Sequence, residues 1–168
     1  MPRCPVLLAL LLVPACGGSS GGGATPPAAA PARLTAADLD LGPATTSADL
    51  VVGLATTTEP APVLLQFAVE LPSALSVAPT DRLQAAVPLA TLDGDFKDGR
   101  FVVLCGDGQN ANASALQVGP LLRLRLVTAT PRQPGTYTIL LRDLRAATND
   151  GGASAATTEP TSVQVTIR

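Results

Sequence analysis

Apolar side chains occur at every second position in three stretches of this chain, and this period limits what the chain can fold into. The stretches are 65–71, 122–126 and 163–167, where Leu, Phe, Val and Ile alternate mainly with polar residues. Such alternation places one face of a β-strand in a core and the other face in water. Further strands are predicted at 39–41, 49–54, 74–77, 85–89, 100–105 and 136–144.

Turn-forming residues separate these apolar runs, as they do between strands. The prolines between the runs are Pro60, Pro62, Pro72, Pro79, Pro120, Pro131 and Pro134, and the sequence NDGG at 149–152 predicts a further turn. The run 101–104 is continuously apolar, which predicts a strand covered on both faces. We therefore predict an all-β sandwich of about seven to nine strands.

The first 16 residues have the order of a bacterial secretory signal. Arg3 is followed by an apolar run at 6–13 and by the small residue Ala15 directly before Cys16. The run is far shorter than the roughly 20 residues of a membrane-spanning helix. The sequence VPAC at 13–16 resembles the lipobox of bacterial lipoproteins, whose cysteine is diacylated. This resemblance implies a signal peptide at 1–15 and a lipid on Cys16; the alternative is an ordinary signal peptide with a cysteine nearby by chance.

Residues 16–33 are rich in Gly, Ser, Pro and Ala, a composition that forms flexible or extended linkers rather than a core. We expect them to tether a single domain at 34–168 to the lipid. The resemblance to lipoproteins implies a location in the cell envelope. It implies the outer membrane if the host has two membranes, because Gly17 is not an acidic retention residue.

The composition argues against several classes of function. The chain has no His, so it lacks the usual general base near neutral pH and the commonest metal ligand. The formal net charge of −2 provides no basic surface for nucleic acid. Once Cys4 leaves with the signal and Cys16 is acylated, Cys105 has no partner for a disulfide. We therefore expect a non-enzymatic monomer without a metal or another cofactor.

The segments 121–149 and 63–77 resemble cohesin modules of cellulosome scaffoldins. The first segment has an alternating strand, a Pro-Gly loop, a strand that begins Gly-Thr-Tyr and a polar Asn-Asp-Gly loop. The second has an alternating strand before a turn and a short strand, although PSAL at 72–75 replaces the family's usual turn. The resemblance implies a jelly-roll sandwich, related in fold to immunoglobulin-like sandwiches and some carbohydrate-binding modules. It also implies binding of dockerins through a sheet face and its loops.

The segment 93–99, DGDFKDG, partly matches a calcium-binding loop. In EF-hand spacing a third ligand would be Lys97 and the twelfth position would be Leu104, neither of which supplies a carboxylate. We favour a solvated hairpin turn, and an irregular calcium site remains the alternative.

Other residues have a functional and a structural interpretation. Cys105 follows the phase of Phe101 and Val103, which predicts a core residue rather than a nucleophile. Four arginines, Arg123, Arg125, Arg142 and Arg145, could form a basic stripe, but we favour solubilising charge. Asn112 begins a glycosylation sequon that carries little weight in a bacterial lipoprotein.

The leading hypothesis is a lipid-anchored, cohesin-like module that presents a sheet face or loops to a protein partner. The alternative is a carbohydrate-binding module on the same fold, for which only Tyr137 and Phe96 could provide stacking platforms. A hydrolytic enzyme is disfavoured, because the acidic residues fall mostly in turns and none marks a catalytic pair.

Overall fold

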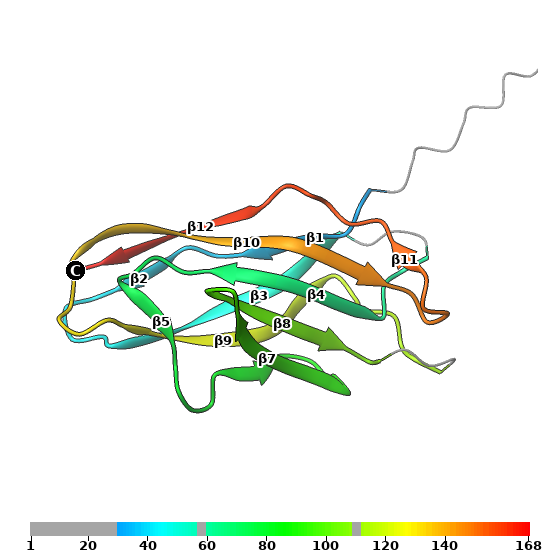
Figure 1. Ribbon diagram of the computed structural model, residues 1–168, viewed down its shortest axis with the longest axis horizontal. Helices are drawn as coiled ribbons and strands as arrows, with labels where there is room; N and C mark the ends of the chain where they lie inside the picture. The colour runs from blue at the N-terminus through cyan, green and yellow to red at the C-terminus, as the bar shows by residue number, and fades with distance from the viewer. Residues whose placement is uncertain (1–29, 57–59, 109–111) are drawn as a thin grey trace, which may run out of the picture.

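The computed structural model describes residues 30–56, 60–108 and 112–168, and it arranges them as two β-sheets packed face to face (Figure 1). The five-stranded sheet has the order β1–β3–β9–β5, and β6 also pairs with β9. Its strands are β1 (Arg33–Ala36), β3 (Ser47–Thr56), β5 (Leu75–Val77), β6 (Leu83–Ala85) and β9 (Gly119–Thr128).

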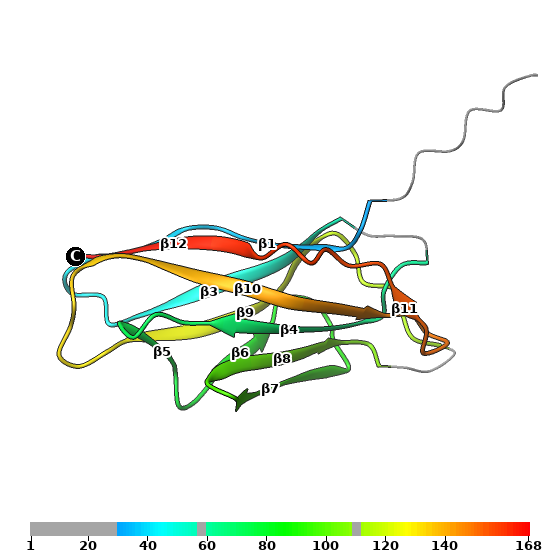
Figure 2. The ribbon, with the colours of Figure 1, turned by 45° about the horizontal axis from the view of Figure 1, so that its top comes forward.

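The seven-stranded sheet has the order β2–β12–β10–β4–β8–β7, and the short β11 pairs with the end of β10. Its strands are β2 (Leu39–Leu41), β4 (Leu64–Glu70), β7 (Thr91–Lys97), β8 (Arg100–Gly106), β10 (Gly135–Ala147), β11 (Ala153–Ser154) and β12 (Thr161–Ile167). The β2–β12 pair is parallel, whereas the other paired strands are antiparallel. Figure 2 shows β10 extending along much of the molecule beside β12 and β4.

The period-two apolar residues fill the space between the sheets. Nine of the alternating positions that the sequence assigns to the core are buried in β4, β9 and β12, namely Leu65, Phe67, Val69, Leu122, Leu124, Leu126, Val163, Val165 and Ile167. The tenth, Leu71, lies one residue beyond the end of β4 and is half-buried against the core. The predicted β-sandwich is therefore confirmed. Every described element is a strand, and none of the described segments forms a helix able to cross a bilayer.

Several predicted details differ from the structure. The strand predicted at 85–89 is wrong, because β6 ends at Ala85 and the chain then connects to β7. The twelve described strands exceed the predicted number because β1, β6, β7 and β11 were not predicted as strands. Two of these, β1 and β11, have only four and two residues, which is too short to show a period. The turn predicted at 149–152 is confirmed between β10 and β11, where the N–H of Gly151 donates to the carbonyl of Thr148.

Candidate binding face

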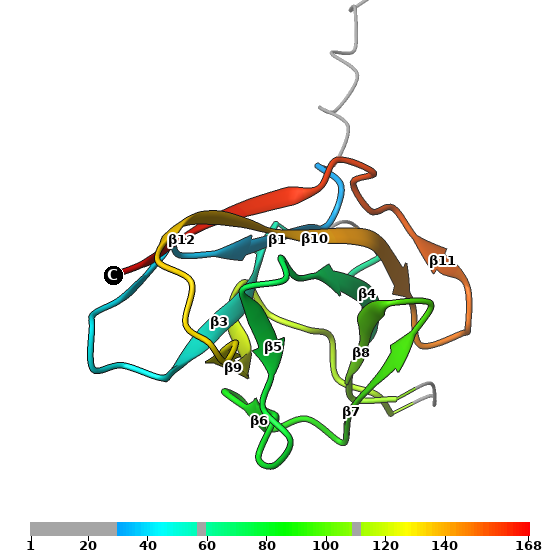
Figure 3. The same ribbon diagram turned by 60° about the vertical axis from the view of Figure 1, so that its left-hand side comes forward.

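The outward side of β10, β4, β8 and β7 forms a broad surface on the seven-stranded sheet. In Figure 3 this side faces away from the five-stranded sheet. We call it the outer face. It consists of Leu64, Gln66, Ala68 and Glu70 on β4, Arg100, Val102 and Leu104 on β8, Asp93, Asp95 and Lys97 on β7, and Leu140, Arg142 and Arg145 on β10.

The structure corrects the prediction that the 101–104 strand is covered on both faces. Phe101 and Val103 are buried in the core, but Val102 and Leu104 alternate with them and are only half-buried on the outer face. A strand with apolar residues on both sides but only one side packed leaves an apolar strip for other contacts. Val102 and Leu104 form such a strip beside Gln66 and Ala68, their register partners on β4.

A β-bulge in β10 determines which side chains reach this face. Arg142 is paired with Ala68 and Arg145 with Gln66, so β10 contains one more residue than β4 over this interval. Asp143 within the bulge has a φ of 56°, a left-handed conformation that Asp tolerates better than most residues. The extra residue shifts the inward–outward alternation of side chains along β10 by one position. Arg142 and Arg145 therefore both lie on the outer face, although they are three positions apart in the sequence.

Two ion pairs hold charged side chains in place across the strands. The Nη1 atom of Arg142 lies 2.6 Å from Oε2 of Glu70, and Nη1 of Arg100 lies 2.9 Å from Oδ2 of Asp143. The hydrogen bond from Arg142 lowers the pKa of the Glu70 carboxyl. These pairs cross-link β10 to β4 and to β8, so they orient the face more than they stabilise the fold.

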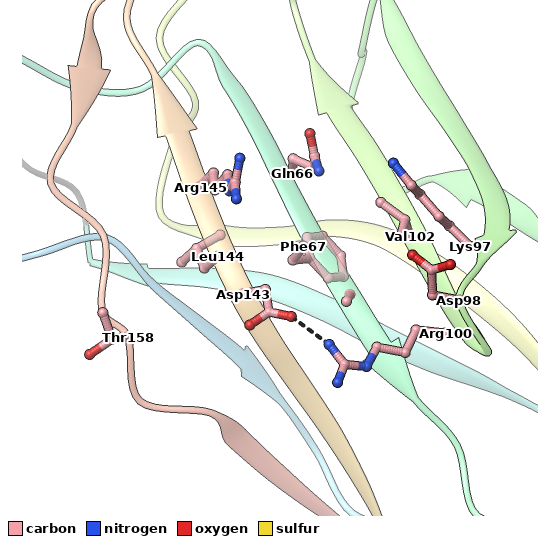
Figure 4. A pocket seen from close by; sticks show the side chains of 11 residues that line it. Gln66, Phe67, Lys97, Asp98, Arg100, Val102, Asp143, Leu144, Arg145 and Thr158 are labelled. Atoms are coloured by element: carbon pink, nitrogen blue, oxygen red, sulfur yellow. Dashed lines mark hydrogen bonds and ion pairs between the residues drawn. The ribbon is translucent and has the colours of Figure 1, made fainter.

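A groove of about 470 Å³ crosses the outer face between the β10 bulge and the β7–β8 hairpin (Figure 4). Its lining includes Gln66 from β4, Val102 from β8, and Arg145 and Asp143 from the bulge. An adjacent groove of about 420 Å³ shares Gln66, Lys97 and Val102 and extends to Asp93 and Asp95. The face is therefore grooved, apolar along its middle and charged along β7 and β10.

The segment 93–99 contains the turn of the β7–β8 hairpin, so the predicted hairpin turn is confirmed. Its first five residues belong to β7, and only Asp98 and Gly99, with φ of 52° and 77°, form the turn to β8. Two positive φ values at adjacent positions are the requirement of a type I′ hairpin turn. No group of three metal-ligating side chains occurs within residues 30–56, 60–108 and 112–168.

The two aspartates on β7 accept hydrogen bonds from backbone N–H groups of the same strand. An Oδ1 atom of Asp93 accepts the N–H of Gly94 at 2.8 Å, and one of Asp95 accepts the N–H of Phe96 at 2.8 Å. With Lys97 and Arg100 flanking a two-residue turn, the N–H groups of Gly94 and Phe96 point away from β8. Both carboxylates therefore cap N–H groups at the free edge of the sheet.

The four arginines proposed as a possible stripe are divided between the sheets. Arg123 and Arg125 lie on β9 in the five-stranded sheet, whereas Arg142 and Arg145 lie on β10 in the seven-stranded sheet. Arg125 pairs with Asp49 at 2.9 Å. The basic-stripe alternative is therefore wrong.

Cys105 is a core residue, as predicted. It is fully buried, and burial raises the pKa of its thiol to about 12. A thiol in such an environment remains protonated and unreactive at neutral pH. Asn112 is exposed, whereas Cys16 lies outside the described residues.

The two proposed stacking platforms do not form a flat aromatic surface. Tyr137 is half-buried against the core, and its hydroxyl donates to the carbonyl of Gln133 at 3.1 Å. Phe96 is 55% exposed, but its ring meets that of Phe101 edge to face, with centroids 5.2 Å apart. The chain's other two phenylalanines, Phe67 and Phe101, are buried. The aromatic side chains therefore do not support the alternative of a sugar-stacking surface.

Sequence reasoning did not find the outer face as a unit. It singled out Arg142, Arg145 and the hairpin separately, but not Gln66, Val102 or Arg100. The signal that could have located the bulge is a change of apolar phase, from Ile139 and Leu141 to Ala146, all three of which are buried.

No protein-family model and no curated protein sequence matches this chain. Solved structures do match. A chain of the Coh-OlpA–Doc918 type I cohesin–dockerin complex from Clostridium thermocellum has a TM-score of 0.65 at 16% identity and covers 83% of this chain and 100% of its own length.

Two further matches are cohesins from other organisms. The sixth cohesin of Acetivibrio cellulolyticus scaffoldin B, in complex with the Cel5 dockerin, has a TM-score of 0.64 at 14% identity and covers 83% of this chain and 100% of that chain. A non-cellulosomal cohesin from the archaeon Archaeoglobus fulgidus has a TM-score of 0.57 at 12% identity and covers 79% and 91%. The resemblance read from the sequence is thus confirmed at the level of architecture: this chain has a cohesin-like fold.

Proposed function

We propose that this chain is a non-catalytic binding module that holds a protein partner of the dockerin type on the outer face. The observation that carries the proposal is the half-buried apolar strip of Val102 and Leu104 on the outer face. Charged side chains and two grooves lie beside this strip. An apolar centre with a polar rim is the usual composition of a protein interface. Two of the matching cohesins are described in complex with dockerins, which supports this class of partner.

A panel of purified dockerin modules, titrated calorimetrically into the full chain, tests the proposal. We expect at least one to bind, and Val102→Glu to weaken that binding at least about tenfold, because it places a charge in the centre of the interface. Val51→Glu is the matched control, since Val51 is exposed on the five-stranded sheet. Binding that survives Val102→Glu but is lost with Val51→Glu would assign the partner to the other sheet. The absence of binding by every dockerin would reject the partner class.

We further propose that a lipid on Cys16 holds the module at the cell envelope, in the outer membrane of a host with two membranes. The order of the first 16 residues supports this proposal. Expression in a bacterium with radiolabelled palmitate should label the wild-type chain and place it in the membrane fraction. Cys16→Ser should abolish both, and an unlabelled wild-type chain would leave only an ordinary signal peptide.

A further inference from the structure

We propose that one end of the groove between the β10 bulge and the β7–β8 hairpin receives an acidic side chain of the protein partner. The inference rests on the proposed function and specifies its chemistry. The groups involved are the guanidinium of Arg145, the side-chain amide of Gln66 and the ammonium of Lys97, all of which line this groove.

The fold brings these three donors together from three strands. Arg145 and Gln66 are register partners on β10 and β4, and the bulge is what turns Arg145 outward. Lys97 precedes the turn of the β7–β8 hairpin, and with Gln66 and Val102 it lines both grooves. In Figure 4 the polar ends of Arg145, Gln66 and Lys97 point toward one end of the groove, away from the Arg100–Asp143 pair.

The two cations at this end of the groove have no ion-pair partner within the described part of the chain. The ion pairs found there use Arg100, Arg125, Arg142 and Arg168, so neither Arg145 nor Lys97 takes part in one. The groove is lined by two carboxylates, Asp98 and Asp143, and Asp143 forms an ion pair with Arg100. The remaining charged side chains of the lining are therefore one carboxylate, Asp98, and two cations, Arg145 and Lys97. Asp93 and Asp95 line the adjacent groove, where each accepts a backbone N–H of β7.

A carboxylate on an aliphatic stem fits this arrangement. Guanidinium and ammonium groups form charge-assisted hydrogen bonds to carboxylates, and the amide of Gln66 adds a neutral donor. Val102, Ala68 and Leu144 supply an apolar lining for the methylene groups of Glu or Asp. Because the cations are exposed, we expect them to govern partner choice and association rate more than total affinity.

An NMR titration of the isotope-labelled full chain tests the inference without the natural partner. The probes are the blocked dipeptides acetyl-Glu-Glu-amide and acetyl-Lys-Lys-amide, and inorganic phosphate. We expect saturable shifts of the Gln66 side-chain amide and of Arg145 Nε–H with the acidic dipeptide only. The shifts should disappear in Arg145→Gln/Lys97→Gln and persist in Arg123→Gln, which changes an exposed arginine on the other sheet.

Each other outcome overturns the inference. Equal shifts with phosphate would indicate an unselective anion site, and shifts with the basic dipeptide would reverse the predicted charge preference. A dockerin that binds the wild type and Arg145→Gln/Lys97→Gln equally would leave the proposed function intact while rejecting the acidic contact. If the contact is made, that double variant should bind the dockerin about tenfold more weakly, with a smaller dependence on salt.

Discussion

The side chain of Arg132 joins three segments that are distant in sequence. Its Nε donates to the carbonyl of Arg168 at 2.9 Å, its Nη1 to that of Thr45 at 2.6 Å, and its Nη2 to those of Leu41 and Gly42 at 2.9 and 2.7 Å. One planar group therefore fixes the end of β12, the β2–β3 connection and the β9–β10 loop. Nothing in the sequence marks this arginine, because its partners are backbone atoms.

We expect Arg132→Ala to lower the free energy of unfolding by about 2 to 3 kcal/mol, since four carbonyls lose a charged donor. Arg132→Lys should recover only part of this loss, because an ammonium lacks the fork of donors. Urea unfolding measures both. The control is Arg123→Ala, which should change stability by less than about 0.5 kcal/mol; equal effects at the two sites would contradict the role of Arg132.

The carboxyls of Asp49 and Glu70 make stability depend on acidic pH. Hydrogen bonds from Arg125 and Arg142, respectively, lower their pKa values from the ordinary 3.8 and 4.5. Because the folded-state pKa values are lowered, the stabilisation is complete above the unfolded-state values and is lost as the pH falls through the folded-state ones. Both pairs are partly exposed to solvent, so the effect is small.

We therefore expect urea-unfolding midpoints to stay level from neutral pH to about pH 5 and to fall below it. Asp49→Asn should lower the midpoint at pH 7 and flatten the decline at acidic pH. Glu159→Gln, an exposed loop change, should do neither. A decline of unchanged slope in Asp49→Asn would remove Asp49 from this explanation.

At the scale of the element, the bulge in β10 depends on one backbone conformation. Asp143 has a φ of 56°, and a β-branched side chain in the left-handed region is strained. We expect Asp143→Val to destabilise the protein by about 1 to 2 kcal/mol. Asp143→Gly and Asp143→Asn should stay close to wild type in thermal unfolding, because they tolerate this φ and lose only an exposed ion pair. Equal losses in all three would attribute the effect to the pair with Arg100 instead.

The edge strand β7 gives a second prediction at this scale. An exposed edge is a template for pairing with another strand, and charged groups commonly block it. We expect Asp93→Ala/Asp95→Ala to release the N–H groups of Gly94 and Phe96 and to cause concentration-dependent association in sedimentation velocity. Asp93→Asn/Asp95→Asn removes the same charge but keeps an acceptor oxygen. If it associates as strongly, charge rather than the capped N–H groups protects the edge.

At the scale of the whole molecule, the sequence predicts what depends on local period. The core of β4, β9 and β12 was predicted residue by residue because one face of each strand is buried. The sequence did not predict which strands lie side by side, since strands that are far apart in the sequence pair with one another in the fold. For this reason Arg125 and Arg142 could be assigned to one surface, although they lie on opposite sheets.

The candidate face was predictable only in part for the same reason. The continuous apolar run at 101–104 is compatible with coverage on both sides, and only the packed structure shows that Val102 and Leu104 are left partly open. The resemblance to cohesins predicted the sandwich and pointed to a sheet face, but it could not specify which charges this chain presents there. In the structure, Arg100 and Arg142 form ion pairs with Asp143 and Glu70, so Arg145 and Lys97 are the cations of this face that can pair with a partner.

The single extra residue of β10 makes the molecule's surface chemistry sensitive to small insertions and deletions. Deletion of one residue from the bulge would exchange the inward-facing and outward-facing side chains in the part of β10 that follows it. Moving the extra residue a few positions along β10 would instead bring a different pair of side chains to the outer face of the same sheet. Related modules could therefore diverge in recognition through the length of this strand while their cores stay the same. Libraries that vary the position of this residue are a direct route to altered specificity.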